Sequence, residues 1–403
     1  MSRSSTLGAS LPPSWHTATL RRVASLKAGD AITSDVISDE GEYPVFGGNG
    51  IRGYTPSYTH DGSHVLIGRQ GALCGNVNFA SGRFWASEHA VVATPVDGIN
   101  VRWLGALLQS MNLNQHSQSA AQPGISVDLV ARLDVPVPPL ITQRAIADYL
   151  DRDTARIDAL VAAKERMVAL LEEARGAFAT DALLGSPVPG GPAGRGQVTL
   201  RPGWSLIPFR RLFREIDVRS ETGSETLLSV SQTRGVIPQS DLGERRQYAE
   251  TLVGYKTCLP GDLVVNRMWV YYGALGAAST PGIVSPDYAV FTPMARLSAK
   301  FAAYVLRTPA YVGEMTRLVR GIGAAFQDAV RKPRLHPSEM GLIEMPVPPP
   351  DEEKALLRRL ETQTDAMMRR IALLNQSTEL LQERRQALIT AAVSGQLDIL
   401  EAA

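Results

Sequence analysis

Two glycine-rich stretches have the spacing of cofactor-binding motifs. Residues 48–53 match the GxGxxG pattern of dinucleotide-binding loops, which is meaningful only where it follows a strand and opens a helix. The next residues, YTPSYTHDG, contain a proline and turn formers, so no helix is expected to start there. Residues 46–50 match the FxGxG form of adenine methyltransferases, but the catalytic tetrapeptide of that family, Asn/Asp-Pro-Pro-aromatic, is absent from the sequence. The segment is therefore interpreted as a glycine-rich turn.

The other reactive side chains form no recognisable catalytic or metal site. His60 and His64 flank a turn without an evident third ligand, so exposed loop histidines are expected rather than a zinc site. The pair at 88–89, Glu-His, could do acid–base chemistry, but no nucleophile is recognisable nearby, and a structural role is favoured over DNA contact, which stays open. Cys74 and Cys258 cannot make a disulfide framework, and no phosphate-binding GxxxxGK[ST] motif occurs. We therefore expect no catalytic residue, no cofactor and no metal in this chain.

Composition and charge indicate a globular protein. Of the 403 residues 44% are hydrophobic and 20% are charged, which excludes disordered and fibrous classes. No apolar run reaches about 18 residues, and the first residues lack the apolar core of a secretory signal, so a soluble, cytoplasmic protein is expected. The net charge is only +1, yet residues 187–349 hold 19 Lys and Arg against 13 Asp and Glu. A local basic surface is therefore compatible with nucleic acid.

An internal repeat fixes the organisation of the chain. The 50 residues from Pro136 and the 50 residues from Pro346 align without a gap at an offset of 210, and 16 positions are identical. Fainter similarity precedes each copy, as between LPPSWHTATLRRV and LRPGWSLIPFRRL. The order is therefore domain, helix, domain, helix. The predicted boundaries are 1–139 and 204–349 for the domains, 140–185 and 350–403 for the helices and C-terminal tail, and 186–203 for a Pro/Gly linker.

The helical segments show the apolar spacing of a coiled coil. Positions 146, 150, 153, 157, 160, 164, 167, 171, 174 and 178 alternate steps of four and three, and eight of the ten are apolar. Six of the ten positions 210 residues later are apolar. The simplest prediction is an antiparallel coiled coil of the two helices with a pseudo-twofold repeat. The alternative is that each helix packs only on its own domain.

The segments between the helices predict mostly β domains. Short aliphatic runs such as HVLIGR, VVAT, DLVVNR and AVFTP alternate with Gly- and Pro-rich turns, while VRWLGALLQSMN and KFAAYVLRTP predict helices. The predicted fold class is therefore α+β.

The helix sequences resemble a known family. PVPPLITQRAIADYLDRDTARIDALVAAKERMVALL, the terminal ERRQALITAAVSGQLDI, QPGIS at 122–126, and YPVFGGNGIRGY and VLIGRQGALCGNV resemble the specificity subunit of type I restriction–modification systems. The second half departs from the family pattern at two places. One is Glu353-Lys354, and the other is RLHPSEMG, which stands where QPGIS stands in the first half. The resemblance implies a non-catalytic subunit whose two target-recognition domains each bind half of a bipartite, asymmetric site in double-stranded DNA. It also implies that the coiled coil sets the gap and docks two methyltransferase subunits, with motor-nuclease subunits as further partners. S-adenosylmethionine, ATP and Mg²⁺ would then be bound by the partner subunits.

Residue chemistry suggests which side chains would contact DNA. Arg reads guanine and clamps phosphates, and Asn and Gln read adenine. The candidates on or beside glycine-rich turns of the first domain are Asn49, Arg52, Tyr54, Arg69, Gln70 and Asn76. Those of the second domain are Arg234, Arg267, Trp269, Tyr271 and Tyr272. For Arg69 and Arg267 a structural strand-end role stays open, and the run 269–272 could instead be core.

Two other classes of function remain open. The chain could be a fragment of a fused type II restriction enzyme–methyltransferase, against which the missing catalytic motifs stand. It could also be a coiled-coil scaffold without DNA binding, against which the basic second domain stands.

Overall fold

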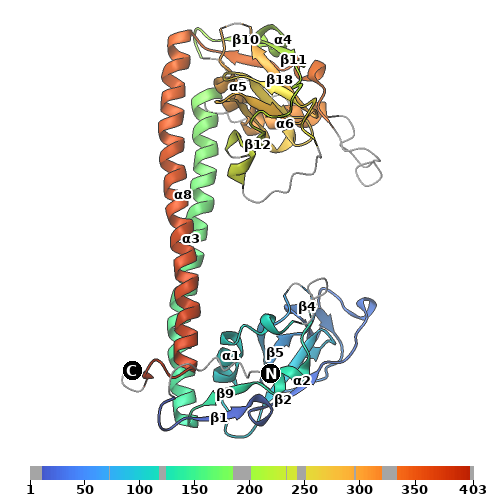
Figure 1. The fold of residues 1–403 in the computed structure, drawn as a ribbon, viewed down its shortest axis with the longest axis vertical. Coiled ribbons are helices and arrows are strands. Elements are labelled where there is room, and N and C mark those ends of the chain that lie inside the picture. Colours follow the sequence, from blue (N-terminus) through green and yellow to red (C-terminus); the bar gives the residue numbers. More distant parts are fainter. Residues whose placement is uncertain are drawn as a thin grey trace. The chain divides into compact units, whose positions relative to one another are not determined.

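The computed structural model divides the chain into two compact units. It describes residues 11–71, 73–117, 124–184, 201–232, 234–242, 251–294, 296–319 and 334–399. Unit 1 comprises residues 1–166 and 374–403, and unit 2 comprises residues 167–373. Each unit therefore contains one β-rich domain and parts of both long helices (Figure 1). The predicted linker lies mostly outside the described residues.

Unit 1 is built on two larger sheets and a two-stranded sheet of β1 and β9. Of the two larger sheets, one is antiparallel with the order β2-β8-β5-β6, and the other has the order β4-β3-β7. Strand β5 is buried along its whole length, and α1 covers the core with the buried side chains of Trp103, Leu104 and Leu108. The elements are β1 His16–Thr19, η1 Leu20–Arg22, β2 Ala24–Ala28, η2 Ser34–Val36, β3 Tyr43–Gly47, β4 Gly50–Thr55, β5 His64–Gly68, β6 Val77–Ala80, β7 Trp85–Ala86, β8 Ala90–Pro95, α1 Val101–Ser110, η3 Leu113–His116, α2 Val127–Ala131 and β9 Asp134–Val137.

Unit 2 repeats this design. Its four-stranded antiparallel sheet has the order β11-β18-β15-β16. This order matches β2-β8-β5-β6 of unit 1, because in both sheets the first strand in sequence pairs with the last, which pairs with a middle strand, which pairs with the strand after it. Three further strand pairs, β10–β19, β12–β13 and β14–β17, complete the domain. The elements are β10 Ser205–Pro208, α4 Phe209–Leu212, β11 Phe213–Ile216, β12 Leu228–Ser231, β13 Gly235–Pro238, η4 Gln239–Leu242, β14 Lys256–Cys258, β15 Leu263–Asn266, η5 Val270–Tyr272, β16 Leu275–Ala277, β17 Gly282–Val284, β18 Tyr288–Pro293, α5 Ala299–Leu306, α6 Pro309–Leu318, α7 Pro337–Met340 and β19 Glu344–Val347.

The two long helices, α3 Leu140–Leu184 and α8 Pro350–Val393, are antiparallel partners (Figure 1). In unit 1 the Arg385 Nε atom lies 2.9 Å from an oxygen of Asp158. In unit 2 Arg175 donates a hydrogen bond to the sulfur of Met368 over 3.0 Å. The two contacts are equivalent under the 210-residue repeat, since 175 corresponds to 385 and 158 to 368. The predicted α+β fold and the mutual pairing of the helices are thus confirmed.

The seam between the helices departs from the strict alternation of four and three at Leu160, Met167 and Arg370, and it uses the neighbouring residues onto which the predicted apolar stripe spreads. Leu160 and Met167 are 46% and 53% exposed, whereas the following residues, Val161 and Val168, are half-buried. The same shift of one residue occurs in α8, where Arg370 is exposed and Ile371 is buried. Apolar residues occupy both neighbouring positions in α3, so periodicity alone could not choose between them. The predicted positions 146, 150 and 157 are buried.

A buried side chain joins the start of each long helix to its domain. The Oε1 atom of Gln143 accepts the backbone N–H of Asn100, the N-cap residue of α1, over 2.8 Å, and its Nε2 donates to the Pro138 carbonyl. Glu353 occupies the equivalent position of α8 and accepts the N–H and hydroxyl of Ser298, the N-cap residue of α5. The departure from the family pattern at Glu353 therefore preserves this connection.

Replacing Gln143 with methionine should destabilise unit 1. Met has a similar length but leaves the Asn100 N–H and the Pro138 carbonyl without their partner, which costs about 1–3 kcal/mol for buried groups. We expect urea denaturation of Gln143→Met to show a lowered free energy of unfolding of that size. The neighbouring Arg144 is exposed, so Arg144→Met should change it by no more than about 0.5 kcal/mol. Equal effects of the two variants would contradict the role of Gln143.

Among the described residues, no helix combines the length and hydropathy needed to span a bilayer.

Candidate nucleic-acid interface

An open hollow of about 620 Å³ in unit 1 gathers several predicted DNA-contacting side chains. It lies where the β3–β4 turn meets the turn after β5. Its lining combines an arginine, amides, an imidazole and two apolar side chains on a glycine-rich wall: Gly48, Asn49, Gly50, Ile51, Arg52, Gln70, Gly71, Leu73 and His89. Such a mixture suits the edges of bases, which present hydrogen-bonding groups and the thymine methyl.

Glycine brings the two turns together. A Cβ atom on Gly68 would lie 2.2 Å from the carbonyl oxygen of Gly48 and 2.9 Å from that of Leu73, so no larger residue fits. Gly50 has φ +100°, which a residue with a side chain rarely adopts, and it starts strand β4. The residues after the GxGxxG match are therefore strand and turn, and the expectation that no helix begins there is confirmed.

The structure separates the six candidates of the first domain. Asn49, Arg52 and Gln70 line the hollow, and Asn76 joins them because its Nδ2 donates to the Oδ1 of Asn49 over 2.6 Å. Tyr54 and Arg69 are half-buried and do not line the hollow. The backbone of Tyr54 exchanges hydrogen bonds with Ser38, and that of Arg69 bonds to His89 and Ile125.

The hollow also contains His89, for which the sequence favoured a structural role over DNA contact, and two residues that the sequence did not single out. His89 lies 3.2 Å from the Oε1 of Gln70 and 3.2 Å from a carboxylate oxygen of Glu88, so it orients the Gln70 amide. Ile51 and Leu73 are 56% and 48% exposed. Their exposure was not predictable, because an aliphatic residue beside a strand is usually core.

His60 and His64 are not exposed loop residues, and that expectation is wrong. The His64 side chain lies within the buried strand β5, where its ring nitrogens contact Thr94 Oγ1 and the Asp61 carbonyl. The His60 ring stacks on Phe84 with centroids 5.4 Å apart, and burial lowers the pKa of His60. No group of three potential metal ligands occurs among the described residues.

In unit 2 three of the five candidates form an aromatic cluster after β15. The rings of Trp269, Tyr271 and Tyr272 lie 4.7–6.4 Å apart. Trp269 is 43% and Tyr272 57% exposed, whereas the intervening Val270 is fully buried. The alternative that this run is core therefore applies to Val270 and in part to Tyr271, which is half-buried against the core of unit 2. The exposed rings offer faces for stacking or for apolar contact with nucleic acid.

The arginine after the central strand has the same backbone role in both units. The carbonyl of Arg69 accepts the N–H of Ile125, and that of Arg267 accepts the N–H of Leu335, the equivalent residue 210 positions later. Arg267 is half-buried and its Nε also donates to the Leu335 carbonyl over 2.9 Å. Leu335 thus marks the counterpart of the QPGIS segment, whose Gln122 and Pro123 lie outside the described residues.

Arg234 lies on a different turn, between β12 and β13, and donates to the Asp241 carbonyl over 3.0 Å. Arg307 links this hairpin to the aromatic turn, since it donates to the carbonyls of Ser231 and Gly273. No sequence signal marks Arg307 as a binding residue, because it follows directly on a mostly apolar helix.

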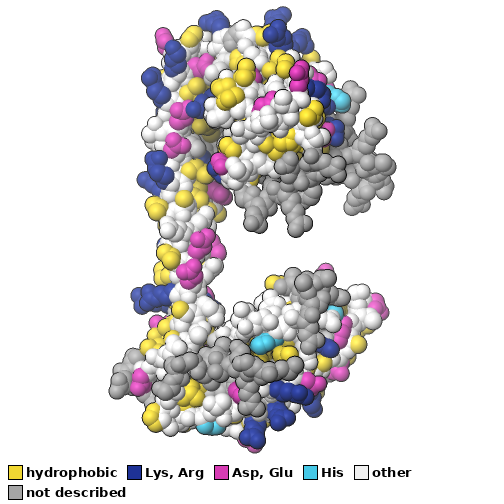
Figure 2. Space-filling model, viewed as in Figure 1, with side chains coloured by type: hydrophobic (Ala, Val, Ile, Leu, Met, Phe, Trp, Pro, Cys, Tyr) yellow, Lys and Arg dark blue, Asp and Glu magenta, His cyan; other side chains and the backbone are white. Residues whose placement is uncertain are grey.

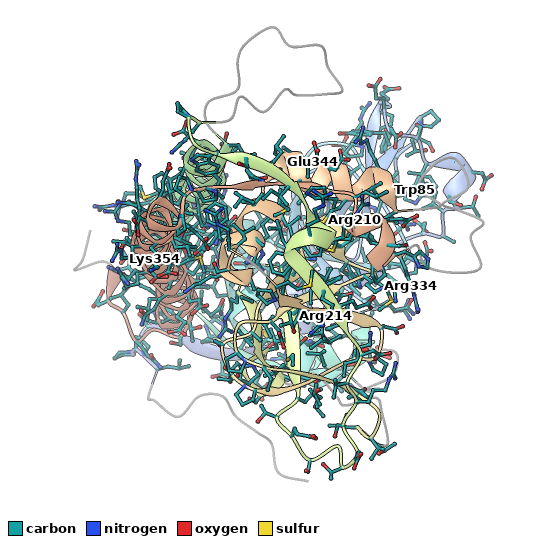
Figure 3. The ribbon with its side chains drawn as sticks, turned by 90° about the horizontal axis from the view of Figure 1, so that it is seen from above. Trp85, Arg210, Arg214, Arg334, Glu344 and Lys354 are labelled. Carbon is teal, nitrogen blue, oxygen red and sulfur yellow. The ribbon has the colours of Figure 1, made fainter. Side chains whose placement is uncertain are left out.

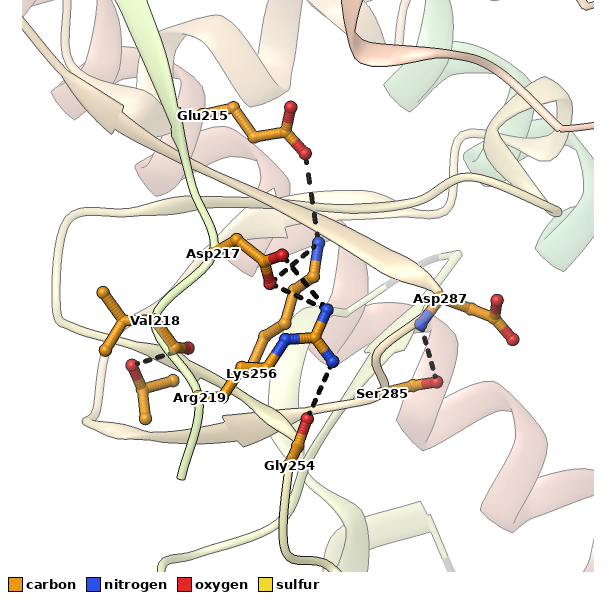
Figure 4. Close-up of polar contacts among 9 residues, drawn as sticks. Glu215, Asp217, Val218, Arg219, Gly254, Lys256, Ser285 and Asp287 are labelled. Atoms are coloured by element: carbon orange, nitrogen blue, oxygen red, sulfur yellow. Dashed lines mark hydrogen bonds and ion pairs between the residues drawn. The ribbon is translucent and has the colours of Figure 1, made fainter. Parts of the chain in front are cut away.

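A lysine–carboxylate cluster at the edge of unit 2 is an ion-pair network (Figure 4). The nearly buried Nζ of Lys256 lies 3.7 Å from Asp217 and 3.9 Å from Glu215. Arg219 contacts Asp217 and donates to the Gly254 carbonyl, and its hydrogen bond is the main reason that the pKa of Asp217 is lowered. These contacts connect β11 to β14.

The fold with two such domains and paired helices is similar to that of a solved chain from a type I restriction–modification system. This chain aligns with one chain of a solved structure described as the structural basis underlying complex assembly and conformational transition of the type I R-M system. The TM-score is 0.69, and the alignment covers 96% of this chain and 100% of that chain. Its identity of 16% supports similarity of fold alone.

Residues 12–166 match the model of the family described as the type I restriction modification DNA specificity domain. This chain is 47% identical over 138 residues to the type I restriction enzyme EcoprrI specificity subunit of Escherichia coli, covering 33% of this chain and 34% of that protein. It is 31% identical over 118 residues to a putative type I specificity subunit of Haemophilus influenzae, covering 28% and 31%. The matches span about a third of the relatives' length. The resemblance seen in the sequence is confirmed.

Proposed function

We propose that this chain is the DNA sequence-specificity subunit of a type I restriction–modification complex. The observation that carries the proposal is a domain that matches the specificity family model, followed by a second domain with the same sheet order, each joined to one of two antiparallel helices. Each domain would bind one half of a bipartite, gapped site in double-stranded DNA. Because the two domains differ in sequence, the two half-sites would differ as well.

Base recognition would use the hollow in unit 1 and the aromatic turn in unit 2. Arg52, Asn49 and Gln70 carry the donors and acceptors that read guanine and adenine in the major groove. In unit 2, Trp269 and Tyr272 supply the exposed contact surface. Phosphate contacts would come from exposed arginines of the basic domain, such as Arg210 and Arg214, which Figure 3 labels.

The helix pair would set the gap between the half-sites. A helix of 45 residues such as α3 is about 68 Å long at 1.5 Å per residue. A rigid pair of this length is suited to act as a spacer, by the logic through which protein geometry fixes half-site separation in other DNA readers.

The same helices would dock two methyltransferase subunits. Leu170 and Leu380 are equivalent under the repeat and are 64% and 58% exposed. Leu160, Met167 and Leu373 are also largely exposed, and apolar side chains reach the surface of the helix pair in Figure 2. Duplicated exposed leucines would give each methyltransferase subunit an equivalent apolar contact.

The chain itself would not be a catalyst. Partner methyltransferase subunits would bind S-adenosylmethionine, and motor-nuclease subunits, if the system includes them, would use ATP and Mg²⁺. The complex would act in the cytoplasm, where its DNA substrate is found.

Lengthening the helix pair tests this function. One heptad inserted after Lys164 and one after Thr378, which face each other in the observed register, would add about 10 Å to the pair. At about 3.4 Å per base pair, the gap of the methylated motif should grow by roughly three base pairs while both half-sites stay the same. Methylome sequencing would read this directly, with a substituted heptad of unchanged length as the control. An unchanged gap, or altered half-sites, would contradict the proposal.

A further inference from the structure

Unit 2 contains a cavity of about 540 Å³ between the β12–β13 hairpin, β16 and the start of α5. Its volume lies in the range of small-ligand sites. Backbone and small side chains, among them Gly235, Gly276 and Ala277, form much of its wall. The charged side chains that line it are all cationic: Arg234, Lys300 and Arg307.

Arg307 is fixed in the cavity wall without a counter-charge. Its Nε donates to the Gly273 carbonyl over 3.2 Å and its Nη2 to the Ser231 carbonyl over 2.9 Å. No carboxylate of the described residues forms an ion pair with it. The pKa of Arg307 is lowered to about 10, mainly by burial and to a smaller extent by the nearby Arg175. A bound anion would offset this loss of hydration.

The guanidinium groups of Arg307 and Arg234 have no carboxylate partner among the described residues. Arg234 also donates to a backbone carbonyl, that of Asp241, and has no ion-pair partner among the described residues. Lys300 is neutralised by Glu361, whose carboxylate lies 2.5 Å from its Nζ. Burial raises the pKa of Tyr304, another lining residue, and the carboxylates of Glu361 and Asp365 add to this effect. The cavity therefore combines two anchored arginines with the hydroxyl group of Tyr304.

We propose that this cavity binds a phosphate group held by Arg307 and Arg234. The planar fork of arginine matches phosphate oxygens, and its remaining N–H groups are available once the backbone carbonyls have fixed its orientation. The phosphate could belong to the DNA backbone or to a free phosphorylated molecule of nucleotide size. The inference does not depend on the function proposed above.

Titration of the full chain with inorganic phosphate tests the site. At constant ionic strength maintained with chloride, ³¹P NMR should show saturable binding. Ser279 lines the cavity and is exposed, so Ser279→Glu should fold normally. Its carboxylate should weaken phosphate binding by about tenfold or more, the effect of one charge-assisted contact. Ser279→Gln, of equal size but neutral, should bind as the unmodified chain does, and Arg307→Met should lose binding.

Adding a DNA duplex distinguishes the two sources. Release of the bound phosphate by the duplex would assign the cavity to the DNA backbone, and retention would assign it to a free phosphorylated molecule. The proposal is overturned if phosphate shows no saturable binding, or if Ser279→Glu and Ser279→Gln bind it equally.

Discussion

Replacing Arg52 and Gln70 together with alanine should reduce the affinity of the assembled complex for its target site by roughly a hundredfold or more. Both side chains line the hollow of unit 1, and each good base contact discriminates by about 1–3 kcal/mol. Competition binding against libraries of duplexes should show relaxed preference in one half-site only. The preference in the other half-site should be unchanged, because unit 2 is untouched.

Arg83 provides the matched control for this double variant. It is an exposed arginine of the same domain, lies outside the hollow, and pairs with Asp61 over 3.2 Å. Arg83→Ala should therefore keep the full sequence preference and lose at most a modest, sequence-independent part of the affinity. If Arg83→Ala and the double variant behave alike, the hollow is not the reading surface of unit 1.

Placing a charge on the exposed leucines of the helices should detach the methyltransferase subunits. Leu170→Glu and Leu380→Glu would each bury an unpaired carboxylate at one docking contact, in addition to losing the apolar contact of leucine. Together these effects correspond to roughly a hundredfold or more in affinity. Native mass spectrometry of the co-expressed complex should show one methyltransferase subunit lost in each single variant and both lost in the double variant.

Leu342 serves as the comparison for the docking variants. It is 58% exposed, as Leu380 is, but lies in the domain between α7 and β19 rather than on a long helix. Leu342→Glu should retain both methyltransferase subunits. Retention of both subunits in the Leu170→Glu, Leu380→Glu double variant would place the docking surface elsewhere.

The repeat made most of the architecture predictable from the sequence. Sixteen identities in 50 aligned residues fixed two copies of one design, and the predicted helices at VRWLGALLQSMN and KFAAYVLRTP correspond to α1 and α5. Only some of the residues at the seam between α3 and α8 could be predicted from the sequence. Leu160 and Val161 are both apolar, so the period of the pattern could not reveal which of them faces α8.

The candidate sites were less predictable because they depend on turns that are distant in sequence. Asn49, Gln70 and His89 share one hollow only because Gly68 lets the backbone of the β3–β4 turn approach β5. Arg307 acts through the carbonyls of Ser231 and Gly273, which are 76 and 34 residues away. Arg69 and Tyr54 were predicted to contact DNA from their residue type and their place beside glycine-rich turns, and they do not line the hollow.

The central claim, that this chain determines the sequence specificity of DNA modification, is tested most directly by sequencing the methylome of the host before and after deletion of its gene. The account predicts that adenine methylation disappears at one gapped, asymmetric motif and is restored by the intact gene. In a host whose partner methyltransferase is expressed, an unchanged methylome after deletion would contradict the account.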